Sequence, residues 1–138
     1  MLDFLKQIKN HNNTVNEFNK AVRQGIPSAV LGVTNAFKAF LISSVEEKVF
    51  FIVKDAISAE KYSNHIRKLT DKKVIYIPPC DVNLISVKAF SKETTYQRIT
   101  AFGEIKEASV IILTPETLMQ GVNVSVEKLK IEKVYTNL

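Results

Sequence analysis

The chain has 138 residues, of which 46% are hydrophobic and 24% are charged. This composition is typical of one globular domain with its own core and excludes a disordered chain. No apolar run approaches the roughly 18 residues of a membrane span, and the first residues lack the order of a signal peptide. The single cysteine, Cys80, excludes an internal disulfide framework, so we expect a cytoplasmic protein. The net charge of +5 is compatible with a polyanionic partner without establishing one.

The first 24 residues predict a helical segment. Apolar residues recur there at spacings of three and four, and the polar run 10–13 divides them into two helices. Gly25 and Pro27 end the second helix. We therefore separate an N-terminal helical segment, residues 1–24, from an α/β module, residues 25–138.

Strands and helices alternate along the rest of the chain. Short apolar runs, of the kind expected for parallel strands buried on both faces, occupy residues 28–32, 49–53, 74–77 and 109–113. Helices are expected over residues 36–45, 58–69 (with Ser58 as N-cap) and 91–106, and from Thr114-Pro115 onward; a loop is expected over 80–90 and a last strand or irregular extension over 124–134. This alternation predicts a three-layer α/β domain whose central sheet is mainly parallel.

The segment from Gly32 to Ala39 carries the functional argument. A phosphate-binding loop reads G-x-x-x-x-G-K-S/T between a strand and a helix, and Gly32 and Lys38 stand at that spacing. Phe37 replaces the second glycine and brings a ring to the place of the phosphate. Ala39 replaces the hydroxyl residue that would coordinate Mg²⁺. We expect a degenerate P-loop NTPase-like fold that binds no ATP. The alternative is that the spacing of Gly32 and Lys38 arises by chance, in which case Phe37 is a core residue of an amphipathic helix.

Residues 31–34, Leu-Gly-Val-Thr, followed by Lys38, resemble the start of UvrB, the helicase of bacterial nucleotide excision repair. The damaged loop is more similar to the N-terminal UvrB-homology module of the transcription-repair coupling factor (Mfd). The similarity continues through residues 51–55, 77–78, 97–102 and 110–120, but after Pro78 the family's aromatic signature is replaced. Under this resemblance the degenerate nucleotide loop comprises Gly32, Thr34, Phe37, Lys38 and Ala39.

The resemblance implies a fragment of a larger DNA-repair ATPase, whose motor domain would bind ATP and Mg²⁺. It implies a non-catalytic scaffold role, with UvrA and RNA polymerase as partners through the parent protein and with packing against its other domains. Two alternatives remain open. One is the nucleotide-binding half of a UvrB-like helicase, and the other is a basic DNA-binding module with Lys88, Lys92 and Arg98 as a contact face. We expect weak DNA binding at most, no catalytic residue, no cofactor and no metal site, since the two histidines lie outside any ligand spacing.

Overall fold

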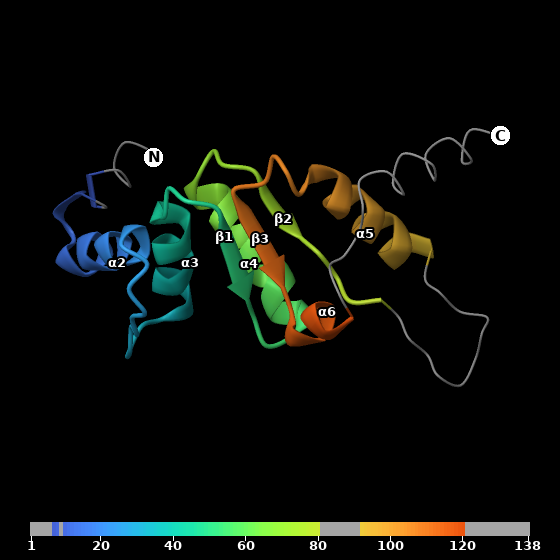
Figure 1. The fold of residues 1–138 in the computed structure, drawn as a ribbon, viewed down its shortest axis with the longest axis horizontal. Coiled ribbons are helices and arrows are strands. Elements are labelled where there is room, and N and C mark those ends of the chain that lie inside the picture. Colours follow the sequence, from blue (N-terminus) through green and yellow to red (C-terminus); the bar gives the residue numbers. More distant parts are fainter. Residues whose placement is uncertain (1–6, 9, 81–91, 121–138) are drawn as a thin grey trace.

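The structure is a computed structural model, and it describes residues 7–8, 10–80 and 92–120. Its elements in chain order are α2 (Asn13–Arg23), α3 (Asn35–Ser44), β1 (Val49–Ile52), α4 (Ala56–Leu69), β2 (Val74–Tyr76), α5 (Lys92–Glu104), β3 (Val110–Leu113) and α6 (Pro115–Met119). Figure 1 shows the strands side by side, with α2 and α3 toward one end of the molecule and α5 toward the other. No helix among the described residues is long and apolar enough to cross a membrane.

The three strands form one parallel sheet in the order β1-β3-β2. Val110 at the start of β3 lies between Val49 of β1 and Val74 of β2. The chain passes from β1 to β2 through α4 and from β2 to β3 through α5. A mixed α/β fold with a parallel sheet is therefore confirmed.

Side chains of β3 alternate between two hydrophobic clusters, one on each face of the sheet. Val110 and Ile112 pack with α3 and α4, in a cluster that includes Ala39, Ala59 and Ile66. On the opposite face, the side chains of Ile111 and Leu113 pack with α5 residues including Ala101 and Phe102. Because β3 is completely buried, it needs apolar residues at every position, which explains why its sequence is continuously apolar.

The strand predicted over residues 28–32 is wrong. Residues 26–34 run without helix or strand between α2 and α3, and the side chain of Leu31 is 88% exposed. Pro27 cannot donate to a strand ladder, and Gly32 has a φ of 71°, outside the strand region. Residues 28–32 are mostly apolar, but no described strand lies beside them to form hydrogen bonds with their backbone groups.

Helix boundaries follow local hydrogen bonds. Asn12 caps α2 by accepting from the Val15 N–H, which confirms the predicted break in the N-terminal helical segment. Helix α2 ends at Arg23, and Gly25 beyond its C-cap has a φ of 65° and completes a Schellman motif. The predicted cap of α4 was wrong: Asp55 is the N-cap, and it accepts from the Ser58 N–H at 2.7 Å. The expected loop after Cys80 and the expected last element over 124–134 lie outside the described residues.

Candidate functional site

The candidate nucleotide loop is closed by its own Thr34. This residue is the N-cap of α3, and its Oγ1 accepts the Phe37 N–H at 3.2 Å. Its carbonyl oxygen accepts the Lys38 N–H at 2.9 Å. The N–H groups of the two positions that correspond to the Gly-Lys pair of a phosphate loop are therefore already bonded within the chain.

Helix α3 also begins too early for a phosphate loop. In such a loop the residues between the first glycine and the lysine remain outside the helix, so that their N–H groups can surround an anion. Here α3 begins at Asn35, and only Val33 and Thr34 separate it from Gly32. The expected spacing is present in the sequence, but the backbone cradle is not formed.

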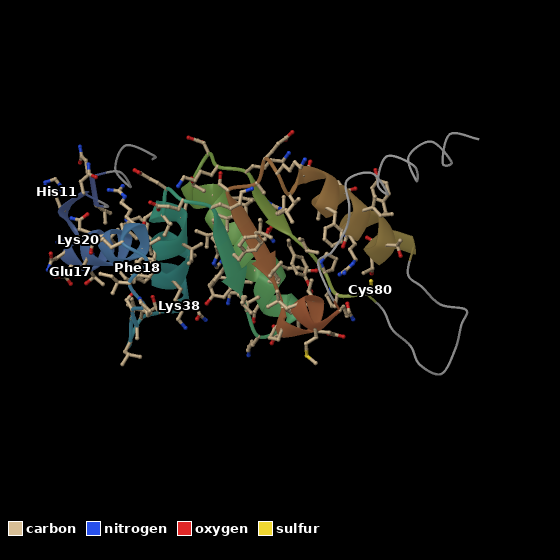
Figure 2. The ribbon with its side chains drawn as sticks, viewed as in Figure 1. His11, Glu17, Phe18, Lys20, Lys38 and Cys80 are labelled. Carbon is tan, nitrogen blue, oxygen red and sulfur yellow. The ribbon has the colours of Figure 1, made fainter. Side chains whose placement is uncertain are left out.

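The side chains of Phe37, Lys38 and Ala39 lie in different environments and do not converge on a common site. Phe37 is partly buried and its ring lies 6.1 Å from that of Phe40, tilted by 43°. The side chain of Lys38 is exposed on the surface of α3 (Figure 2). Ala39 is completely buried in the cluster with Val53 and Ala59, so a small apolar side chain is needed there for packing.

Tyr62 of α4 fixes the start of α3 from the neighbouring helix. Its hydroxyl donates to Asn35 Oδ1 at 3.0 Å, and its ring meets that of Phe51 edge-on at a centroid distance of 5.0 Å. No local sequence pattern relates Tyr62 to Asn35, so the place of Tyr62 beside the candidate loop could not be predicted. The contact ties the candidate loop to the sheet through α4.

Tyr76 is the last residue of β2, at the carboxyl end of the sheet, and its hydroxyl is partly buried. Burial raises the pKa of the Tyr76 hydroxyl, and the negative charges of Glu60, Glu116 and Asp55 raise it further. The pKa of Asp55 is lowered, first by its hydrogen bonds to Ser58 and then by the neighbouring Lys54. Ligands of parallel α/β sheets bind at this edge, where Asp55 also pairs with Lys54 at 3.5 Å. Within the described residues, no group of three or more histidine, cysteine or acidic side chains could hold a metal ion.

Of the predicted basic contact face, only Arg98 has a described side chain. Lys88 lies outside them, and of Lys92 only the backbone at the start of α5 is described. The Arg98 guanidinium donates to the Pro78 carbonyl at 2.5 Å and lies 5.1 Å from the Phe102 ring centroid. Arg98 therefore holds α5 to the end of β2, a role that its place in the sequence did not indicate.

Three other lysines hold the amino-terminal edge of the sheet together. Lys48 donates to two carbonyl oxygens in the connection between α5 and β3, each at 3.0 Å. Lys72 donates to the carbonyl oxygen of Val45 after α3. Lys73 pairs with Glu107 at 2.8 Å and Glu104 at 3.4 Å. Contacts within the chain thus engage the ammonium groups of these three lysines, and carboxylates pair with that of Lys73.

Comparison of the chain with models of protein families, with curated proteins and with solved structures finds no significant match. The candidate site is therefore interpreted from its own residues.

Proposed function

We propose that this chain is a non-catalytic scaffold module of a DNA-repair ATPase, and that it neither binds nor hydrolyses ATP. It would serve transcription-coupled nucleotide excision repair by supporting the domains of the parent protein that contact UvrA and RNA polymerase. In this proposal the fold is a degenerate relative of the P-loop NTPases. The similarity of residues 31–38 to the coupling-factor module suggested the family, and the parallel sheet is compatible with it.

The observation that carries the proposal is the closed start of α3. Thr34 uses both its side chain and its carbonyl oxygen to bond the N–H groups of Phe37 and Lys38. An anion held by the N–H groups of Phe37 and Lys38, as in a phosphate loop, would have to displace both contacts. Lys38 alone, exposed to water, is a weak anion site.

A non-catalytic role also accounts for Ala39. A magnesium-binding hydroxyl at this position would lie inside the core formed by α3, α4 and the sheet. The position has become part of the packing between layers, which is the use expected in a module that supports other domains. The helicase-half alternative requires the opposite environment, a solvent-accessible position beside a bound phosphate.

Calorimetric titration with Mg-ATP and a steady-state hydrolysis assay test the proposal together. We expect no saturable heat at millimolar nucleotide, a concentration at which binding needs only about 4 kcal/mol. We also expect no hydrolysis above that of buffer. Saturable binding with a stoichiometry near one would favour the helicase-half alternative.

A further inference from the structure

The outer edge of β2 has an open backbone position at Tyr76. On one side of Tyr76, the Ile77 N–H donates to the Ile112 carbonyl, and on the other side the Lys73 carbonyl accepts from β3. The N–H and the carbonyl of Tyr76 itself therefore point away from β3. Neither group has a hydrogen-bond partner among the described residues. An edge position of this kind can pair with a further strand.

This open position lies in a groove between α4 and α5 that holds a second open polar group. The groove has a volume of about 440 Å³, and Ser63 of α4 lines it together with Tyr76. Ser63 is only 3% exposed, yet its hydroxyl forms no hydrogen bond with the part of the chain that the structure describes. Every fully enclosed side-chain N or O atom in that part has a partner, so the Ser63 hydroxyl is open to the groove.

Charged side chains also line the groove, and Glu60 is the one without a counter-charge. The Arg67 guanidinium donates to the Val74 carbonyl at 3.1 Å and 3.3 Å, and Glu104 lies 3.4 Å from the Lys73 ammonium group. Glu60 of α4 is exposed and forms no hydrogen bond or ion pair within residues 7–8, 10–80 and 92–120. The charge left uncompensated in the groove is therefore negative and complementary to a cation.

Two tyrosines stand beside this charge. After burial, the charge of Glu60 has the largest effect in raising the pKa of the Tyr76 hydroxyl, so the Glu60 carboxylate and this hydroxyl lie close together. Tyr96 lines the groove from α5 and is 71% exposed. The faces of aromatic rings attract cations, which adds to the preference of the groove for positive charge.

We infer that this groove binds an extended segment of a partner protein that carries a lysine or arginine side chain. The segment pairs with the outer edge of β2 through the N–H and carbonyl of Tyr76, and its basic side chain pairs with Glu60. A helix has no free backbone groups to offer Tyr76 along its length, whereas an extended chain has both a donor and an acceptor. The inference is independent of the proposed scaffold role, because it involves neither α3 nor a nucleotide.

NMR titration of the full chain with two capped synthetic peptides tests the inference. The peptides, Thr-Val-Lys-Val-Thr and Thr-Val-Glu-Val-Thr, differ only in the charge of the central residue. We expect the lysine peptide to shift the Tyr76 amide saturably at millimolar concentration, and the glutamate peptide to bind about three- to tenfold more weakly. At saturation, the Tyr76 amide should exchange with solvent at least about tenfold more slowly, while exchange of the Ile112 amide in the central strand stays unchanged.

Glu60→Gln tests the charge contact. This variant should bind the lysine peptide about threefold more weakly and the two peptides within about twofold of each other. The matched control is Glu17→Gln, since Glu17 is an exposed carboxylate on α2, at the other end of the molecule from α5 (Figure 2). It should leave both affinities unchanged.

Several results would overturn the inference. Equal affinity for the two peptides would exclude the charge contact, and binding that leaves exchange of the Tyr76 amide unaltered would exclude strand pairing. Capped lysine alone, used as a third probe, should bind more weakly than the lysine peptide, and equal binding would make the groove a site for small cations. The absence of saturable shifts at millimolar peptide would reject a peptide site, as would a Tyr76 amide that is as protected as that of Ile112 before any peptide is added.

Discussion

Substituting Ala39 by threonine places the family's hydroxyl residue back into the candidate loop, and the structure predicts that this damages the fold without restoring nucleotide binding. Ala39 is completely buried against Val53, Ala59 and Ile66. The added methyl and hydroxyl groups overpack this cluster, at a cost of about 1–3 kcal/mol. Lower helix propensity adds up to about 0.7 kcal/mol. The hydroxyl can bond a carbonyl one turn earlier, so we add nothing for an unsatisfied group.

The free energy of unfolding should therefore fall by about 1–4 kcal/mol, measured by urea denaturation. With a urea slope of about 2 kcal/mol per M, this moves the midpoint by about 0.5–2 M. Ala36→Thr is the matched control, because Ala36 lies exposed on the same helix and should show only the propensity term. If Ala39→Thr costs no more than Ala36→Thr, then position 39 is not the packing site described above. Adding Phe37→Gly should weaken α3 further without creating ATP binding.

Four further outcomes are expected. Thr34→Ala should lower the free energy of unfolding by about 1 kcal/mol in denaturant titration, whereas Thr34→Ser should retain most of it, because the cap oxygen is kept. The pKa of Asp55 is lowered in the folded chain, so Asp55 contributes its full stability above the unfolded pKa of about 4. That contribution is lost as the pH falls through the lower folded pKa. Asp55→Asn should therefore reduce the loss of stability at acid pH, measured by thermal melting at a series of pH values. Arg98→Ala should destabilise the chain but leave its DNA affinity, measured by fluorescence anisotropy, unchanged. Any DNA binding should weaken with salt, with a slope of log K against log salt of about −0.9 per phosphate contact. Sub-micromolar DNA binding in physiological salt would contradict this. Residues 1–138 alone should bind purified UvrA weakly or not at all, and a stoichiometric pull-down would oppose this.

The strands that could be predicted were those with continuous apolar sequence and partners on the sheet. Residues 49–52, 74–76 and 110–113 lie in the parallel sheet, and burial on one or both faces dictates their composition. Residues 28–32 have a similar apolar run but no strand beside them. Pairing is a long-range property, and a short run cannot report it without knowledge of its neighbours.

The candidate site shows the same division between local and long-range information. The retained Gly32 and Lys38, and the changed Phe37 and Ala39, were visible in the sequence, and they predicted a loop unable to hold a nucleotide. The cap contacts of Thr34 depend on the residue at which α3 begins. The loop motif favoured a later helix start, so these contacts could not be predicted. Neither the burial of Ala39 nor the contact of Arg98 with the end of β2 has a local signal, because each depends on an element distant in the sequence.

The central claim, that the start of α3 is closed to phosphate, is tested most directly by backbone amide chemical shifts of the full chain during titration with Mg-ATP. At about 5 mM nucleotide even a millimolar site would be largely occupied. We predict that the amide shifts of residues 33–39 stay unchanged apart from effects that a matched concentration of inorganic salt also produces. Saturable shifts centred on Phe37 and Lys38, absent with the salt control, would show that Thr34 gives up its contacts to an incoming phosphate and would contradict the claim.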